Sequence, residues 1–343
     1  MASVVGFAAC GSVQPPLSDG HDSGIDGDSG IHGDSGIDGP ATSLPPSCSG
    51  LPATCGSGQD SCCSSAILPA GTYFRSFDVV GDTTSGITSY PATVSSFQLD
   101  KYEVTVGRFR AFVNAGKGTQ SAPPGAGAGA HANIAGSGWE TSWNTSLVVD
   151  RSALVTALKC DSMFQTWTDV PAGNENRPIN CVSWFEAMAF CAWDGGYLPT
   201  EAEWNYADTG GDQQRAYPWS SPPSATIIDG TRASFDDGSG CIGDGLPACA
   251  VTDLINVGTK PAGDGRWGHS ELAGNVLEWT LDWAAAYTTP CTDCANLSPA
   301  ASREIRGGSF SGGKNGLRTP LRANLPPAMR NAITGLRCAR SAQ

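Results

Sequence analysis

The sequence predicts an α+β fold that is rich in loops and held together by disulfides, and three observations support this. Gly 44 and Pro 23 make up nearly a fifth of the 343 residues, which is typical of long connecting segments. Near residue 97 a strand-like alternation turns into a helical pattern, and two further helix starts carry capping boxes. Thirteen cysteines indicate an oxidising compartment, where thiols persist as disulfides.

The first ten residues resemble the end of a bacterial lipoprotein signal. MASVVGFAAC is a short apolar run of small residues that closes at Cys10. We therefore expect residues 1–10 to be a truncated signal segment and Cys10 to be lipidated; the alternative is an ordinary N-terminus with a free thiol. The basic start of a secretory signal is missing, which is consistent with a translation start upstream of Met1. No apolar run approaches the roughly 20 residues of a membrane span, so the expected membrane contact is through the lipid.

A flexible tether is expected to follow over residues 11–47. It contains the repeat DSGIDG-DSGIHG-DSGIDG, from Asp22 to Gly39. These small and acidic residues bury too little apolar surface to offset chain entropy; weak Ca²⁺ binding by the aspartates is the less favoured interpretation. Residues 48–65 are expected to form a stapled segment whose four cysteines pair with one another, with metal binding as the alternative.

Residues 66–343 are expected to form the main domain. A strand with Phe97 and Leu99 on one face leads into a helix that starts at Val106. Further helices are expected after three capping residues, Asp150, Ser183 and Thr200. The glutamates three residues after Ser183 and Thr200 satisfy backbone donors in a capping box, so we interpret them as structural rather than catalytic.

The net charge limits the classes of partner. The chain has a formal charge of −13. Binding to nucleic acid or to an anionic membrane surface requires a basic surface, which a chain of this charge is not expected to have. Acidity is equally typical of a soluble surface protein and of a divalent-cation binder, so it does not identify a partner.

Four blocks in this order resemble one family: FQLDKYEVTVGRFRAFVNAG at 97–116, RPINCVSWFEAMAFCAWDGGYLPTEAEWNYADTGG at 177–211, GHSELAGNVLEWTLDW at 268–283, and REIRGGSFSGG at 303–313 with TGLRCAR at 334–340. Over residues 66–340 they resemble the formylglycine-generating enzyme family, also called sulfatase-modifying factors. The resemblance implies the sulfatase-modifying-factor fold, a relative of C-type-lectin-like domains. It also implies an enzyme that oxidises a substrate cysteine with O₂ at a copper ion.

The expected copper ligands are missing. The family enzymes hold Cu(I) between two cysteine thiolates, as a soft metal prefers. The matching positions here are Gly312 (or Ser311) and Leu317, and no cysteine lies between Ile305 and Arg337. We therefore expect neither copper nor copper-dependent oxidation. Ser309 is the residue that we expect in the corresponding pocket.

The same stretch, Gly308–Lys314, has the G-x-x-x-x-G-K spacing of a phosphate-binding loop. Asn315 stands where such a loop has serine or threonine, and Gly316 and Pro320 disfavour the helix that must follow. We interpret the glycines instead as the family's RGGS element, which lets a strand turn beside the active site.

The resemblance also implies a calcium site within ELAGNVLEW. The family pattern assigns four ligands: the side chains of Glu271 and Glu278 and the backbone carbonyls of Gly274 and Val276. Hard oxygen ligands of this kind suit Ca²⁺. The alternative is that Glu278 pairs with a buried arginine such as Arg306 or Arg318. The family's other calcium site would fall between Ser234 and Asp253, where too little of the pattern remains to assign ligands.

Eight cysteines of the main domain are expected to form four disulfides. Cys191 and Cys338 stand where the family has a structural disulfide. The CxxC of Cys291 and Cys294 is expected to be a closed local disulfide, with metal binding or redox cycling as alternatives. The sequence alone leaves the connectivity of the others open, and the expected pairs are Cys160–Cys181 and Cys241–Cys249.

The expected function is that of an exported binding module for a peptide, protein or glycan. We expect a membrane-anchored lipoprotein of a Gram-negative bacterium, or otherwise a secreted protein. The alternative is an oxidoreductase or other enzyme that uses different residues of the same pocket, including cysteine oxidation if the motif alignment is wrong. A sister group, the ergothioneine-type sulfoxide synthases, uses histidine-bound iron. The four histidines here, two of them in the tether, do not supply that set.

Overall fold

Short helices and strands joined by long loops make up the computed structural model, which describes residues 44–81, 88–246 and 248–342. The four α-helices are α1 (Val106–Asn114), α2 (Arg151–Ala157), α3 (Trp184–Trp193) and α4 (Glu201–Asp208). Residues 44–343 form one compact unit. The expected signal segment, Cys10 and the tether up to residue 43 lie outside the described residues.

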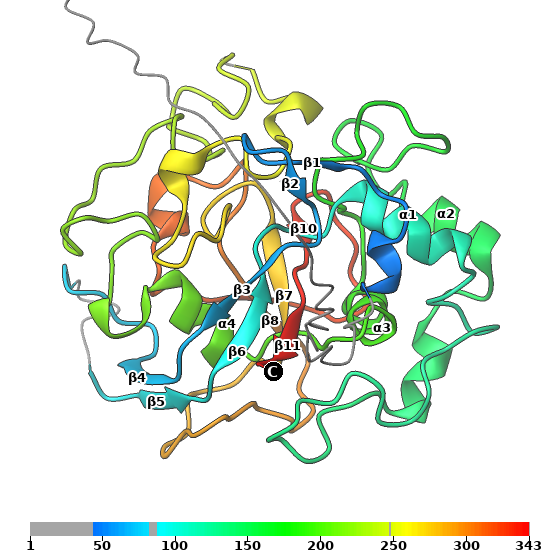
Figure 1. Ribbon diagram of the computed structural model, residues 1–343, viewed down its shortest axis with the longest axis horizontal. Helices are drawn as coiled ribbons and strands as arrows, with labels where there is room; N and C mark the ends of the chain where they lie inside the picture. Colours follow the sequence, from blue (N-terminus) through cyan, green and yellow to red (C-terminus); the bar gives the residue numbers. More distant parts are fainter. Residues whose placement is uncertain (1–43, 82–87, 247, 343) are drawn as a thin grey trace, which may run out of the picture. The chain divides into compact units, whose positions relative to one another are not determined.

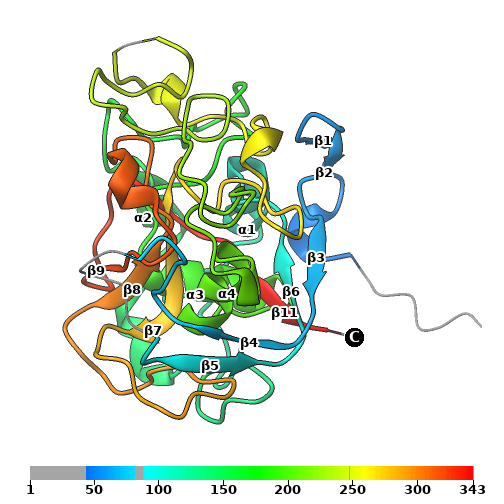
Figure 2. The same ribbon diagram turned by 90° about the vertical axis from the view of Figure 1, so that its left-hand side faces the viewer.

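Most strands belong to two sheets, whose members are labelled in Figure 1 except β9, which is labelled in Figure 2. One sheet has the order β10-β7-β8-β9, with β7 (Leu277–Trp283), β8 (Arg303–Arg306), β9 (Ala323–Leu325) and β10 (Thr334–Gly335). The other has the order β11-β6-β3, with β3 (Ser65–Leu68), β6 (Phe97–Asp100) and β11 (Ala339–Ser341). β7 is antiparallel to β8 and parallel to β10, so the end of ELAGNVLEW, the arginine of RGGSF and the first two residues of TGLRCAR meet in one sheet.

Two hairpins complete the strand set. β4 (Gly71–Phe74) pairs with β5 (Pro91–Val94) in antiparallel orientation, and Figure 2 shows the two strands side by side in the lower part of the view. β1 (Ala53–Cys55) pairs with β2 (Asp60–Ser61) in the cysteine-rich segment. That segment packs against the rest of the unit, because the amide of Ser47 donates to Asp194 and Arg108 donates to the Ser47 hydroxyl.

The helices begin where the sequence predicts. Ser183 and Thr200 each close a capping box, with Glu186 and Glu203 as reciprocal partners. Asp150 caps α2 with its side chain. These capping bonds use both glutamates for backbone donors, which agrees with the structural interpretation of the two residues.

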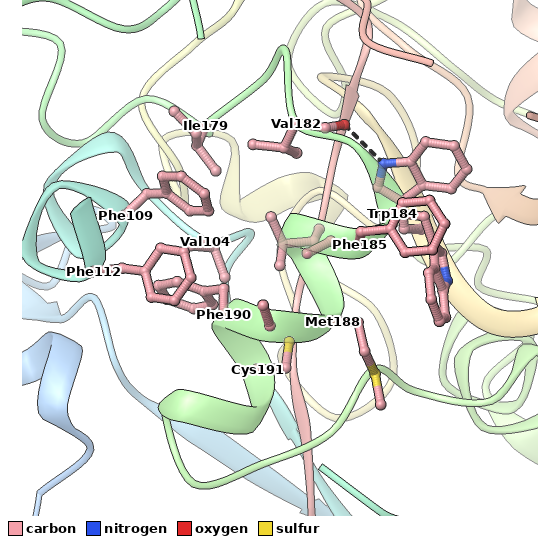
Figure 3. Close-up of a cluster of buried hydrophobic side chains, with 14 of the residues drawn as sticks. Val104, Phe109, Phe112, Ile179, Val182, Trp184, Phe185, Met188, Phe190 and Cys191 are labelled. Carbon is pink, nitrogen blue, oxygen red and sulfur yellow. Dashed lines mark hydrogen bonds between the residues drawn. The ribbon is translucent and has the colours of Figure 1, made fainter. Parts of the chain in front are cut away.

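The core lies around α1 and α3 (Figure 3). Phe109 and Phe112 of α1 face Phe190 of α3, with ring centroids 5.4 and 5.5 Å apart. α3 is apolar nearly all round and buried from Trp184 to Cys191, and both α3 and α4 pack against β7. None of the helices in the described part of the chain is long and apolar enough to cross a membrane.

Six disulfides staple the unit. Four of them are the pairs expected from the sequence: Cys160–Cys181, Cys191–Cys338, Cys241–Cys249 and Cys291–Cys294. In the cysteine-rich segment, Cys63 reaches back to Cys48 and Cys62 to Cys55. Disulfides of this density fit an exported protein in an oxidising compartment.

Candidate functional site

The RGGSF segment leaves β8 through two glycines that no other residue could replace without strain. Gly307 and Gly308 have φ of 99° and 72°, values that side chains disfavour. A Cβ on Gly308 would lie 2.8 Å from the carbonyl oxygen of Gly316. Ser309 follows; it is 3% exposed, and its hydroxyl lies 3.5 Å from that of Ser311. The segment turns sharply and forms no phosphate loop, since residues 314–317 make only a single 3₁₀ turn.

The two copper positions contain no donor atom of the required kind. Leu317 is 1% exposed and packs with Tyr217, Phe235 and Ala273 in a small apolar cluster. Gly312 has no side chain. All twelve cysteines of the described residues are in disulfides, so that part of the chain has no free thiol to serve instead. The residues present therefore do not fit a copper ion.

An open cleft lies directly beside these positions. Its volume is about 460 Å³, and its walls are Asp236, Asp237, Gly238 and residues 313–316. The amide of Asp236 donates to the carbonyl of Gly312 at 2.9 Å, which joins the cleft to the RGGSF segment. The Ser239 hydroxyl and amide lower the pKa of Asp237, so its carboxylate is charged at neutral pH. The cleft is thus polar and acidic, with Lys314 as its cation.

Three buried glutamates gather at the start of β7 around one arginine. Both oxygens of Glu278 accept hydrogen bonds from Arg337, each at 2.7 Å, and the Trp204 indole donates to Glu278 at 2.8 Å. Glu103 accepts from the amide of Val276 at 3.1 Å. Burial, followed by the charge of Glu271, raises the pKa of Glu103 well above its usual value.

The same crowding acts on Glu271, whose two oxygens accept from the Gly258 amide, at 2.9 and 3.0 Å, and from no other donor of the described residues. Burial raises the pKa of Glu271 to about 8, and the negative charge of Glu278 adds to the shift. At neutral pH Glu271 is therefore mostly protonated, and a further positive charge nearby would favour its ionised form.

Of the expected calcium ligands, Glu278 is already engaged in an ion pair. The alternative interpretation, that Glu278 pairs with a buried arginine, is confirmed, but the partner is Arg337. The two arginines given as examples pair elsewhere, Arg306 with Glu201 and Arg318 with Asp78. Within the described ranges, no three His, Cys, Asp or Glu side chains are placed to hold a metal by themselves. A cation here would need backbone oxygens as well, as the family pattern implies.

Backbone oxygens are available at this point. Among the described residues, no hydrogen bond to the carbonyl of Gly274 or Val276 is found. Glu271 and Asn275 hold positive φ values of 53° and 60°, which keeps the turn tight between the two glutamates. This donor set fits Ca²⁺ in chemistry. Sequence reasoning missed Glu103, although DKYEV in the first family block contains it.

The two described histidines are not brought into a metal site. His131 contacts Glu203 at 3.1 Å; burial lowers the pKa of His131, but the hydrogen bond that Glu203 accepts from it outweighs this and raises the pKa. His269 is fully buried, and burial lowers its pKa to about 3. His21 and His32 lie outside the described residues.

Fold and site together define a disulfide-stapled α+β domain with a glycine turn beside a buried carboxylate cluster. The sulfatase-modifying factor enzyme 1-like domain matches residues 57–342, and the chain therefore belongs to that family.

Relatives of established name match over different extents. A formylglycine-generating enzyme of Streptomyces coelicolor is 32% identical over 179 residues, covering 50% of this chain and 54% of the relative. Hercynine oxygenase of Mycolicibacterium smegmatis is 28% identical over 296 residues, covering 80% of this chain and 60% of the relative. The chain spans about half the length of the formylglycine-generating enzymes that it matches. PvdO from Pseudomonas aeruginosa has a TM-score of 0.54 at 20% identity, over 81% of this chain and 94% of that chain, which shows the fold alone.

Proposed function

We propose that this protein is an exported, lipid-anchored binding module of its family that does not oxidise cysteine. The observation that carries the proposal is that no thiol is free to bind copper in the described residues, since every cysteine there is in a disulfide. In addition, the apolar side chain of Leu317 stands at one of the family's copper-ligand positions. Cu(I) needs soft ligands, and hydrocarbon cannot replace a thiolate. The lipid anchor rests on the sequence around Cys10 alone.

The ligand is a peptide, protein or glycan that binds in the acidic cleft. Asp236, Asp237 and Lys314 provide charge, and Gly238 and Gly316 leave the walls free of side chains. A cleft of about 460 Å³ has room for a few residues or sugar units. A peptide with a basic side chain, or a glycan whose hydroxyls bind the carboxylates, suits this lining.

A single experiment tests the loss of oxidase chemistry. The purified protein is incubated with a cysteine-containing sulfatase peptide, Cu(I) and O₂, and the peptide is analysed by mass spectrometry. We expect no formylglycine and no tight copper binding in a competition titration with a Cu(I) chelator. A copper-loaded family enzyme, run alongside, validates the assay. Formylglycine production by this protein would show that the motif alignment is wrong.

We further propose that Ca²⁺ binds at the carboxylate cluster. Glu271, Glu278 and the carbonyls of Gly274 and Val276 would hold it, with Glu103 adjacent. Bound Ca²⁺ supplies positive charge between carboxylates that otherwise repel one another and so stabilises the fold. It takes no part in a reaction here.

Calcium removal is expected to lower the melting temperature. A ligand at a hundred times its Kd stabilises by about 2.7 kcal/mol, which corresponds to roughly 4 °C for a unit of this size. Calorimetry with EDTA, with excess Ca²⁺ and with Mg²⁺ measures the shift. Glu271→Gln should remove the dependence on Ca²⁺, whereas Asp212→Asn, at an exposed ion pair, should keep it. Equal melting temperatures in EDTA and in Ca²⁺ would contradict the site.

A second candidate is an enzyme that uses other residues of the same region. The broad match with hercynine oxygenase, over 80% of this chain, favours it. Incubation with thiol and histidine-derived substrates under O₂, with iron and without, followed by mass spectrometry, separates this candidate from a binding module.

A further inference from the structure

The disulfide between Cys291 and Cys294 has unequal sulfurs. The two cysteines are three residues apart in a CxxC. Cys291 is 4% exposed and belongs to an apolar core cluster, while Cys294 lies partly exposed at the edge of that cluster. Directional thiol–disulfide exchange needs this asymmetry, because one sulfur must be open to an incoming thiolate while the other is protected.

A buried guanidinium contacts the accessible sulfur. Nη1 of Arg75 donates to Sγ of Cys294 at 3.6 Å. Arg75 is 5% exposed, and Nη2 donates to the carbonyl of Thr288 at 2.7 Å. Its guanidinium also lies 4.3 Å from the centre of the Tyr287 ring. Within the described ranges no carboxylate forms an ion pair with Arg75, so its charge is available to stabilise a thiolate on Cys294 once the disulfide opens.

The carboxylate within the CxxC, that of Asp293, is engaged elsewhere. The carboxylate of Asp293 accepts from the amide and the hydroxyl of Ser95, both at 2.7 Å, and from Asn133 at 2.8 Å. These three donors hold the carboxylate with Ser95 and Asn133 and lower the pKa of Asp293, so its charge is already compensated.

The backbone of the CxxC is held independently of the disulfide. The amide of Thr93 in β5 donates to the carbonyl of Cys291, and the amide of Asp293 donates to the carbonyl of Thr93, both at 2.9 Å. Opening the sulfur–sulfur bond would therefore leave the loop docked on β5. A cystine can open and close reversibly under these conditions.

We propose that Cys291 and Cys294 form a thiol–disulfide exchange site for dithiols, with Arg75 as the positioning residue. A thiolate of the dithiol attacks Sγ of Cys294, and the bond to Cys291 breaks. Cys291 leaves as a thiolate and takes up a proton. The second thiolate of the substrate then attacks the first substrate sulfur, which is bonded to Sγ of Cys294 in the mixed disulfide. This attack closes the substrate disulfide and releases Cys294 as a thiolate beside Arg75. The dithiol loses two electrons and becomes a disulfide, and the protein cystine is reduced to two thiols.

The order in which the cystines open tests the proposal on the intact protein. The oxidised protein is treated with graded dithiothreitol at neutral pH, quenched with acid, alkylated and mapped by peptide mass spectrometry. Cys160–Cys181 and Cys241–Cys249 are internal controls, since Cys160 and Cys249 are exposed and no guanidinium contacts their sulfurs. We expect Cys291–Cys294 to open about tenfold faster than either. Earlier opening of the exposed cystines would overturn the proposal.

Variants at Arg75 separate charge from packing. Arg75→Met should slow the release of Cys294 from the mixed disulfide, and with it complete reduction of the pair, about tenfold, whereas Arg75→Lys, which keeps the charge, should retain most of the rate. Circular dichroism checks that both variants fold. If the pair in Arg75→Met were completely reduced as fast as in the wild type, the role of Arg75 would be refuted; if the variant failed to fold, the wild-type order of opening would still decide.

A dithiol substrate provides the direct readout. A synthetic peptide with two cysteines should be oxidised in a ratio of about one peptide per wild-type protein in the absence of O₂. The Cys291→Ser/Cys294→Ser variant should oxidise none. Equal oxidation by both proteins, or none by the wild type, would count against the proposal.

Discussion

Replacement of Arg337 with methionine is expected to destabilise the fold by about 3–5 kcal/mol. All three nitrogens of the Arg337 guanidinium are used: two pair with Glu278, and the remaining contacts go to the carbonyls of Asp100, Lys101 and Ser270. Both members of the ion pair are completely buried. Methionine would fill much of the space but leave Glu278 charged and without its partner, near Glu103 and Glu271. Urea unfolding in EDTA measures the loss without interference from Ca²⁺.

Two further variants show whether the buried charge is the cause. Arg266→Met removes an exposed arginine that pairs with Asp212 and should cost less than about 1 kcal/mol. Glu278→Gln, added to Arg337→Met, should recover part of the lost stability because the unpaired charge is then gone. If Arg337→Met lost no more stability than Arg266→Met, the ion pair would not be what holds the start of β7.

Loss of the Cys191–Cys338 disulfide is expected to have an effect of similar size. The two cysteines are 147 residues apart, and both are fully buried in the core. In the chain-entropy estimate, closing a loop of this length is worth about 5 kcal/mol. The bond ties the end of α3 to the segment before β11, so two elements that are remote in sequence are held in one core. The Cys191→Ala/Cys338→Ala variant should melt roughly 8 °C below the wild type.

The chain offers a matched control for this effect. Cys241–Cys249 closes a loop of only 8 residues, for which the same estimate is about 2.5 kcal/mol. Cys241→Ala/Cys249→Ala should therefore lose about half as much stability in calorimetry. Equal losses in the two variants would mean that loop entropy is not the main contribution and that local packing decides.

Some features of the fold could be predicted because they depend on residues close in sequence. The capping boxes of Ser183 and Thr200 need only a hydroxyl and a glutamate three residues later, and both are present in the structure. The absence of cysteine from the stretch around Gly312 and Leu317 is likewise visible in the sequence. The Cys191–Cys338 pairing was expected from the family resemblance, not from spacing.

Other features needed the tertiary structure. The sequence suggested two possible arginines for Glu278, and the structure shows a third, Arg337, because β10 brings the LRCAR segment beside β7. The acidic cleft combines Asp236 and Asp237 with residues 313–316, and no local motif links these segments. Glu103 joins the carboxylate cluster from the other end of the chain, 173 residues from Val276.

The sequence by itself determined the helix starts and the lack of cysteine at the family's copper positions, since each depends on residue type and short spacing. Only the tertiary structure decided which buried groups meet: Arg337 with Glu278, and Arg75 with the sulfur of Cys294, 219 residues away. The physical reason is that a buried charged group is tolerated only where hydrogen-bonding partners are brought to it. Packing of the whole chain, rather than local pattern, selects that partner.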